Sequence, residues 1–327
     1  MSMVLGVVKP SGMSSHDVVS RVRRGLGEKR VGHAGTLDPF ASGVLPVLVG
    51  PATRLDKYVT EHDKSYVADI ALGASTATDD RCGEVLRTAP VPPSAYDPGF
   101  ASEALDAFVG KSMQMPPAYS AIKVGGKKAC DEARKGNLIK LEPRPIEVYS
   151  AQLLGIEDKE DVVVWCVDFH VSKGTYVRAL ARDVGRKVGV PAHLAELERK
   201  RVGCIGIEDC LPLDDIDSLR ANAQIDPVRL LGMRVLFADE EQSAMVRNGR
   251  GIDPSRSRMY EFCGSRPDNG CSCMPAFVES HAPLEDGELV AVVSSNRLSA
   301  VYRYDPARRM LVADCVFQVE VSRGADI

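Results

Sequence analysis

Regular spacing of hydrophobic residues predicts the helices of this chain. In Thr175–Val188 the apolar residues recur at intervals of three and four, which gives a helix one apolar face. Arg178 and Arg182 lie one turn apart on this segment, off its apolar stripe. A second helix is predicted near Asp17–Leu26, closed by Gly27, which is a typical residue just beyond a helix end.

Short apolar or alternating runs predict strands between these helices. Such runs are bounded by glycine, proline or acidic turn residues, as strands in a mixed fold usually are. Ser14 and Ser15, which follow the first run, are good N-caps for the helix after it. The predicted strands are Val4–Val8, Val44–Val49, Tyr66–Leu72, Ile146–Ile156 and Val162–Val171.

Glycine and serine residues set two further predicted boundaries. Ser102 is expected to cap a helix over Glu103–Val109. Farther along, Ala118–Val124 is predicted as a strand, Gly125-Gly126 as a turn and Lys127–Lys135 as a helix.

The pattern changes after Cys210. Leu211–Ile225 is acidic and is interpreted as a helix or linker that leaves the first domain. A helix over Glu240–Arg247 then precedes three strand-like runs, which predicts a small β-rich barrel or sandwich. We therefore expect a catalytic domain over 1–210, a connector over 211–235 and a small domain over 236–327. The three runs are Leu289–Val293, Leu298–Tyr304 and Leu311–Val319.

Composition supports a folded protein without a membrane span. The chain has 327 residues, of which 44% are hydrophobic, enough for a sizeable core. No apolar run approaches the length of a membrane helix, and the N-terminus lacks a signal-peptide pattern. Six of the nine cysteines are scattered singly, as is usual in a reducing compartment. A cytoplasmic location is the resulting expectation.

Charge is distributed unevenly along the chain. The net charge of -4 argues against a protein that coats nucleic acid through bulk positive charge. However, Lys111–Pro145 and Lys173–Arg201 each hold eight basic and three acidic residues, and Lys9–Arg30 holds six and two. Ile205–Met245 balances them with nine acidic and three basic residues. A basic face able to meet phosphate is therefore expected, with salt-sensitive binding.

The most unusual segment is Val31–Leu45, which reads VGHAGTLDPFASGVL. Its glycines permit tight turns and close approach of a ligand, and Pro39 biases Asp38 toward extended geometry. A single carboxylate is thus held on a stiff loop between a basic helix and an apolar strand. The plainer alternative is an aspartate that caps a turn.

Five blocks in order resemble the TruB family of tRNA pseudouridine synthases. GHAGTLDPFASGVL is similar to the family's catalytic motif, and the other blocks match from Val4 to about Gly203. The other blocks are KPSGMSS, KSY with LG and TATD, PAYSAIK with GK, and SKGTYVR.

The resemblance implies an α+β fold, in which helices and loops flank a central, mainly antiparallel sheet. It also implies isomerisation of uridine 55 in the T-loop of tRNA. The N1–C1′ bond breaks, the base rotates and C5–C1′ forms, with no cofactor and no metal. The sequence contains no P-loop and no dinucleotide-binding glycine fingerprint, which agrees with a reaction that uses no cofactor.

Roles follow from the resemblance residue by residue. Asp38 matches the essential aspartate, a nucleophile or a stabiliser of a cationic sugar, and Arg178 matches the arginine that pairs with it. Tyr66 matches the tyrosine that stacks on the flipped base. Taken alone, each of these side chains would more often have a plain structural role: Asp38 as a turn cap, Arg178 as a solvated helix residue and Tyr66 as a core residue of a strand. The expected substrate or RNA contacts are His33, Tyr176, Leu197, Lys9, Lys64 and Lys123.

The C-terminal domain resembles the small RNA-binding PUA module of bacterial family members. Its similarity rests on Val246–Arg250, Leu298–Asp305 and Met310–Phe317. This resemblance implies that the module binds the acceptor end of tRNA. The expected partner is therefore tRNA, contacted at both its T-arm and its acceptor end. No obligate protein partner is expected.

Two departures from the family pattern bear on function. Cys130 stands where an aromatic residue is usual after the GK pair, which weakens an RNA contact there. Ser255–Met274 looks like an insertion, and its cysteines with a nearby histidine suggest zinc. Their spacing is atypical for a zinc knuckle and favours a mobile loop. The residues concerned are Cys263, Cys271, Cys273 and His281.

Two other functions compete with the stand-alone enzyme. A catalytically idle RNA-binding protein would not need the set of Asp38, Tyr66 and Arg178. A guide-dependent synthase of the archaeal and eukaryotic type is expected to carry extra tails for partner proteins, and this sequence shows no such tail. The stand-alone enzyme is therefore the preferred hypothesis.

Overall fold

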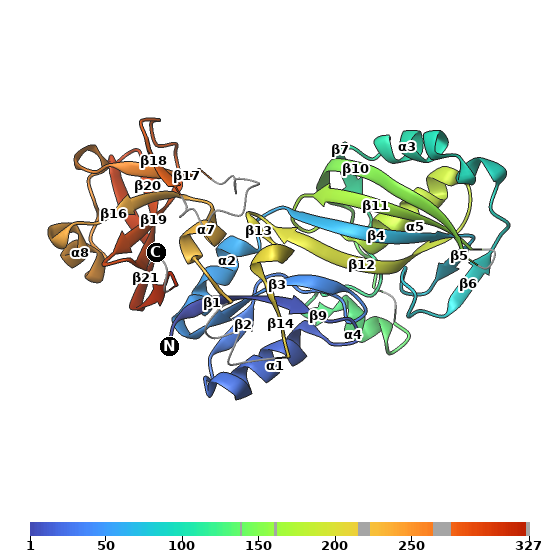
Figure 1. The fold of residues 1–327 in the computed structure, drawn as a ribbon, viewed down its shortest axis with the longest axis horizontal. Coiled ribbons are helices and arrows are strands. Elements are labelled where there is room, and N and C mark those ends of the chain that lie inside the picture. Colours follow the sequence, from blue (N-terminus) through green and yellow to red (C-terminus); the bar gives the residue numbers. More distant parts are fainter. Residues whose placement is uncertain (138, 160–161, 215–222, 264–275, 325–327) are drawn as a thin grey trace. The chain divides into compact units, whose positions relative to one another are not determined.

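The computed structural model describes residues 1–137, 139–159, 162–214, 223–263 and 276–324 (Figure 1). The expected α+β class is confirmed, with mainly antiparallel strand pairing and a separate C-terminal β-rich sheet. The chain divides into two compact units. Unit 1 comprises Met1–Pro39, Gly43–Glu61 and Val202–Ile327, and unit 2 comprises Phe40–Ser42 and His62–Arg201.

Unit 1 begins with an antiparallel strand pair. β1 (Met3–Lys9) pairs with β3 (Ser42–Val49) without a break, from Met3 opposite Val49 to Lys9 opposite Gly43. Short strands extend it: β2 (Val31–His33) pairs with β3, and β14 (Leu211–Pro212) and β15 (Gln224–Ile225) pair with β1. Both ends of the segment interpreted as a helix or linker are thus strands, and residues 215–222 lie outside the described part.

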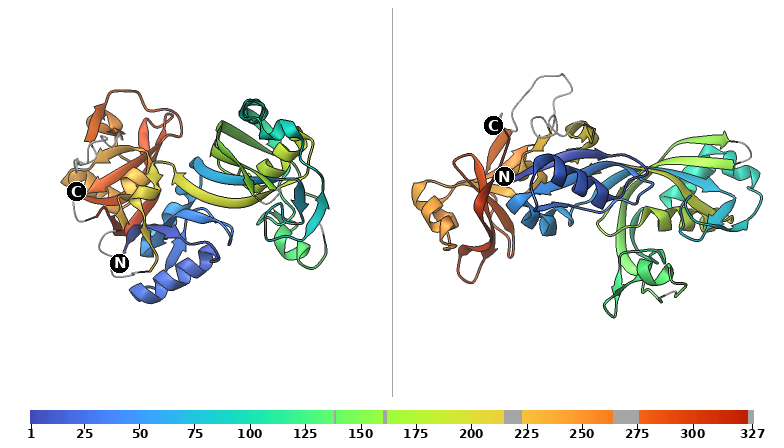
Figure 2. Two further views of the ribbon diagram at one scale, coloured as in Figure 1. Left: turned by 45° about the vertical axis from the view of Figure 1, so that its right-hand side comes forward. Right: turned by 90° about the horizontal axis from the view of Figure 1, so that it is seen from below.

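Helix α1 (Ser15–Leu26) packs against this strand pair, as Figure 2 shows in dark blue. Ser14 accepts a hydrogen bond from the backbone N–H of Asp17, and the Asp17 carboxylate accepts one from the N–H of Ser14. This reciprocal cap and the left-handed Gly27 confirm Ser14 as an N-cap and the predicted end of the helix, which begins at Ser15, two residues before the predicted Asp17. The apolar face of the helix is buried and includes Val18, Val19 and Val22.

The C-terminal part of unit 1 is a six-stranded sheet in the order β18-β17-β16-β19-β20-β21 (orange to red in Figure 1). Helix α8 has the predicted bounds, Glu240–Arg247, and the three predicted runs are β19, β20 and β21. The strands are β16 (Arg234–Phe237), β17 (Met259–Cys263), β18 (Ala276–Ser280), β19 (Leu289–Ser294), β20 (Arg297–Asp305) and β21 (Met310–Ser322). The other elements among the described residues of unit 1 are η1 (Gly50–Leu55), α2 (Asp56–Val59), β13 (Ile205–Gly206), η3 (Ile207–Asp209), α7 (Pro227–Leu231) and η4 (Pro254–Arg256).

In the sheet of unit 2, neighbouring strands follow the order β12-β4-β11-β10-β7. Helices α3 (Pro98–Asp106) and α5 (Val177–Val188) contact each other, and they contact β10 and β4 respectively, so both cover one face. Trp165 and Phe169 are fully buried under this layer. The strands are β4 (Lys64–Leu72), β7 (Gly110–Gln114), β10 (Arg144–Lys159), β11 (Val162–Val171) and β12 (Ala192–Val202).

Three predictions in unit 2 are wrong: the start of α3, the helix over Lys127–Lys135, and the strand over Ala118–Val124, of which only Lys123–Val124 is a strand. Helix α3 begins at Pro98, not Glu103, because Asp97 caps it and proline is favourable in the first turn. Lys127 and Lys128 form β9, which pairs with β8 (Lys123–Val124) as a hairpin, so helix α4 is only Ala129–Ala133. A second hairpin, β5 (Ala74–Thr76) with β6 (Val85–Thr88), and η2 (Pro93–Tyr96) complete the unit.

Candidate active site

Hydrogen bonds join the loop that carries Asp38 to the end of β1 and the segment between β1 and α1. The Lys9 ammonium donates hydrogen bonds to the carbonyl oxygens of Pro10 at 2.9 Å, Met13 at 2.6 Å and Pro39 at 3.3 Å. The N–H of Gly12 also donates to Pro39, at 2.8 Å. Residues on the C-terminal side of Asp38 are thereby fixed.

The N-terminal side of Asp38 is held by Ser15, the buried first residue of α1. Its hydroxyl donates to the Leu37 carbonyl at 3.2 Å and accepts from the Leu37 N–H at 2.9 Å. Asp38 itself is half-buried. Gly35 has a φ of 79°, in the left-handed region that glycine adopts readily, which agrees with the tight turns expected of this loop.

The predicted contacts His33 and Lys9 belong to the same unit as Asp38. Lys9 is fully buried. This placement favours support of the loop over the RNA contact expected from the sequence. His33 is half-buried on β2 and lies near Asp56. Burial raises the pKa of the Asp56 carboxyl, and the charge of His33 opposes that shift.

Unit 2 holds the other predicted site residues. Tyr66 lies on β4 opposite Phe169 of β11 and is 8% exposed, and Leu197 on β12 is 7% exposed. Lys64 is also buried, and its ammonium donates to the His62 carbonyl. Lys123, by contrast, is exposed on the β8–β9 hairpin, as an RNA contact must be.

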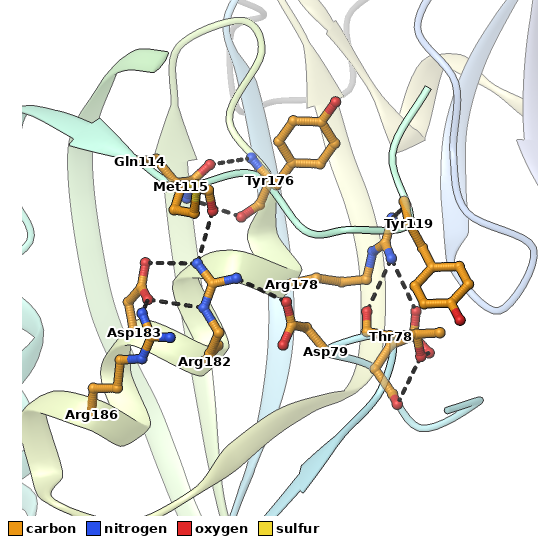
Figure 3. A network of polar contacts seen from close by, with 11 residues as sticks. Thr78, Asp79, Gln114, Met115, Tyr119, Tyr176, Arg178, Arg182, Asp183 and Arg186 are labelled. Atoms are coloured by element: carbon orange, nitrogen blue, oxygen red, sulfur yellow. Dashed lines mark hydrogen bonds and ion pairs between the residues drawn. The ribbon is translucent and has the colours of Figure 1, made fainter. Parts of the chain in front are cut away.

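Tyr176 is the N-cap residue of α5. The buried side-chain amide of Gln114 accepts from the Tyr176 N–H at 2.9 Å and donates to the Tyr176 carbonyl at 3.1 Å (Figure 3). Tyr176 has no side-chain cap for the helix, so this amide satisfies backbone groups at the start of α5. The backbone that leads into Arg178 is therefore held in place.

Arg178 is buried in the first turn of α5 and binds two loops. Its guanidinium donates to the Thr78 carbonyl at 3.0 Å and the Tyr119 carbonyl at 3.1 Å, as Figure 3 shows. It also forms an ion pair with Asp80 at 3.5 Å, and both side chains are 7% exposed. A planar fork of donors suits such a three-way contact, which a lysine would not reproduce.

Asp80 is the functional candidate that sequence reasoning missed. Its carboxylate accepts from the Thr78 hydroxyl at 2.6 Å and from the Cys82 N–H at 2.9 Å. The loop is compact at Gly83, where a Cβ atom would lie 2.5 Å from the Thr78 hydroxyl. The signal available in the sequence was its place directly after the TATD block.

The structure groups the predicted site residues by unit. Asp38, His33 and Lys9 belong to unit 1, whereas Tyr66, Arg178, Tyr176, Leu197, Lys64 and Lys123 belong to unit 2.

Neither a metal cluster nor a membrane helix occurs in the described part of the chain. No group of three or more His, Cys, Asp or Glu residues there is arranged to hold a metal ion. Cys271 and Cys273 lie outside the described residues, as does the side chain of Cys263. No helix among the described residues is long and apolar enough to cross a membrane.

Comparison with known proteins identifies clear relatives. The family model described as TruB family pseudouridylate synthase (N terminal domain) matches residues 23–177. The tRNA pseudouridine synthase B of Caldanaerobacter subterraneus subsp. tengcongensis is 42% identical over 250 residues, covering 76% of this chain and 85% of that protein. The same-named protein of Listeria monocytogenes serotype 4b is 36% identical over 318 residues, covering 95% of this chain and 96% of that protein.

Solved structures share the fold. A chain in the structure of an H/ACA RNP bound to a substrate RNA containing 2′-deoxyuridine superposes with a TM-score of 0.68 and 22% identity. The match covers 97% of this chain and 85% of that chain. A chain of a Cbf5-Nop10-Gar1 complex gives a TM-score of 0.65 with 24% identity, covering 98% of this chain and 85% of that chain.

Proposed function

This chain belongs to the TruB family of pseudouridylate synthases, and we propose that it converts uridine 55 in the T-loop of tRNA to pseudouridine. The observation that carries the proposal is the similarity to tRNA pseudouridine synthase B of Listeria monocytogenes over 95% of this chain. The fixed Asp38 loop supports it, because Lys9 and Ser15 hold the residues on both sides of that carboxylate.

Asp38 is the proposed reactive group. Its carboxylate either attacks the sugar or stabilises positive charge on it while the N1–C1′ bond breaks. The base then rotates and C5 bonds to C1′, and any bond between Asp38 and the sugar breaks at the same time. The C5 proton leaves to solvent and N1 takes up a proton, so that the product is an isomer of the substrate. The reaction is redox-neutral and uses no cofactor.

The base is proposed to enter a pocket built from unit 2. Tyr66 stacks on the flipped uracil and stands near the departing C5 proton, and Tyr176 and Leu197 line the pocket. The family resemblance gives Arg178 the role of the cation that keeps the catalytic carboxylate ionised beside a desolvated base, and the proposal adopts that role. The guanidinium donates hydrogen bonds to the Thr78 and Tyr119 carbonyls, and these bonds hold it in one orientation, unlike an arginine that extends into solvent.

RNA binding is proposed to use exposed cations and the C-terminal sheet. Lys123, Lys127 and Lys128 are all exposed on one short hairpin. They meet the phosphates of the T-arm, while the PUA-like sheet grips the acceptor end. The enzyme is proposed to act without a protein partner.

Tritium release tests the function. Wild-type protein alone should release tritium from 5-tritiated uridine in an unmodified tRNA transcript and in a T-arm stem-loop, with the product mapped to position 55. Asp38→Asn should bind the RNA with wild-type affinity and release none. Asp286→Asn, an exposed aspartate of the same unit, is the matched control and should be fully active.

Three results would contradict parts of the proposal. Near-wild-type turnover by Asp38→Asn would remove that carboxylate from the reaction. Modification only within a guide ribonucleoprotein would show that the protein does not act alone. RNA binding without any turnover would favour the idle RNA-binding alternative.

A further inference from the structure

Arg182 has no role in the proposed reaction so far, yet it binds two other segments of unit 2 as well as its neighbour on α5, Asp183. Its guanidinium forms an ion pair with Asp79 at 3.0 Å, donates to the Met115 carbonyl at 2.8 Å and donates to the Asp183 carboxylate at 3.1 Å (Figure 3). Its side chain is only 15% exposed. Such shielding makes the ion pair stronger than a surface pair, which is usually worth little.

Arg182 repeats, one helical turn later, the arrangement around Arg178. Arg178 joins Asp80 and Thr78 to the Tyr119 carbonyl, and Arg182 joins Asp79 to the Met115 carbonyl. Both arginines therefore connect the same two segments, loop 76–83 and segment 115–119, through one rigid helix.

Asp79 is held in an unfavourable conformation. Its φ of 59° lies in the left-handed region, which non-glycine residues rarely occupy. Its carbonyl accepts from the Leu194 N–H at 3.0 Å, so β12 holds its backbone on one side. Arg182 holds its side chain on the other side.

The Asp79 side chain is 16% exposed and borders a cavity. Asp79 and Arg182 line a cavity of about 440 Å³, together with Arg87 and Arg186. The ion pair with Arg182 therefore holds the Asp79 carboxylate at the edge of this cavity. Burial raises the pKa of Asp79; the charges of Arg182 and Arg178 oppose this shift, whereas Asp183 adds to it.

We propose that Arg182 is a positioning residue for pseudouridine formation. Paired with Asp79, it fixes loop 76–83 against segment 115–119, and these two segments supply the carboxylate and both carbonyls that orient Arg178. The inference rests on the proposed function, because it concerns the geometry of the same site.

Single-turnover kinetics test the proposal. With excess enzyme and saturating tRNA, Arg182→Met should lower the rate constant by about ten- to a hundredfold, since small misplacement of catalytic groups is costly. The dissociation constant for tRNA should change less than about twofold. Arg186→Met is the matched control, because Arg186 lies one turn farther on α5, is 68% exposed and pairs only with Asp183 among the described residues.

A rescue variant separates positioning from simple loss of stability. In Arg182→Met the Asp79 carboxylate loses its closest cation, so its ionised form becomes costly, and the rate deficit should grow as the pH rises from about 5 to about 8. The remaining charges that face Asp79 are those of Arg178, Asp183 and the cavity residues Arg87 and Arg186. Arg182→Met/Asp79→Asn removes the unpaired charge and should recover at least about threefold of the rate, without the pH trend.

The outcomes are distinct. A wild-type rate in Arg182→Met, an equal deficit in Arg186→Met, or a double variant no faster than Arg182→Met would overturn the proposal. An inactive wild-type protein would instead overturn the proposed function. If Arg182→Met does not fold, Arg182→Lys decides: it keeps a charge for Asp79 without the fork that reaches Met115, and an intermediate rate is expected, whereas an unchanged rate refutes the role.

Discussion

Replacing Lys9 with methionine is the sharpest test of how the Asp38 loop is held. Methionine has a similar length and removes only the ammonium, which donates to the carbonyls of Pro10, Met13 and Pro39. Because Lys9 is fully buried, water cannot replace these donors without opening the loop.

The magnitude follows from these bonds. A hydrogen bond to a charged group contributes about 1.5–3 kcal/mol. Pro39 keeps the bond from Gly12, so two of the three acceptors lose their donor among these contacts. Part of the loss is offset, because the variant no longer buries an ammonium. We expect the loop to be destabilised by about 2–4 kcal/mol, which corresponds to a roughly 30- to 700-fold larger equilibrium constant for local opening.

Hydrogen exchange measures this opening directly. The Gly12 and Leu37 amides, bonded to Pro39 and to the Ser15 hydroxyl, should lose protection in Lys9→Met. The single-turnover rate should fall while tRNA affinity is retained. Lys29→Met, at an exposed lysine of the same unit, should change none of these.

Two results would refute this reasoning. Unchanged protection of Leu37 would show that the ammonium does not hold the loop. Weakened tRNA binding with a normal rate would show that Lys9 contacts the RNA, as expected from the sequence.

Three further predictions follow from other contacts. Asp80→Asn should lower the single-turnover rate about tenfold with tRNA binding retained, because the buried Arg178 guanidinium loses its ion pair. Asp56→Asn should be more stable than wild type at neutral pH but not at pH values near 4. The raised pKa of Asp56 means that the folded state binds more protons, so wild-type stability falls as pH rises through that pKa, which urea unfolding at several pH values will measure. Filter binding at several salt concentrations should show weaker affinity and a salt slope lower by about 0.7–0.9 per lost phosphate contact when three exposed lysines become alanine: Lys123, Lys127 and Lys128.

Local signals predicted several elements of the fold well. The Ser14 cap and Gly27 bound α1, and the bounds of α8 are those predicted, because capping residues and apolar spacing act within a few residues. Where two local signals compete, the prediction fails. Asp97 with Pro98 prevails over Ser102 as the start of α3, and pairing across the Gly125-Gly126 turn takes Lys127 out of a helix.

The partners of the site residues could not be predicted. Arg182 and Asp79 are 103 residues apart, and Arg178 and Tyr119 are 59 apart. No periodicity connects such positions, because strand pairing and helix packing bring them together. Resemblance to a family supplies roles for matched residues, but it names neither Asp80 nor Arg182.

Exposure separates two kinds of cation that look alike in the sequence. Lys9 and Arg178 are buried, and their donors are directed at carbonyls and a carboxylate of the protein itself. A buried cation already committed to such acceptors would have to break those bonds to reach a phosphate. The exposed hairpin lysines, such as Lys123, meet no such cost. Substituting the buried cations should therefore change the rate of the chemical step, and substituting the exposed lysines should change affinity and its salt dependence.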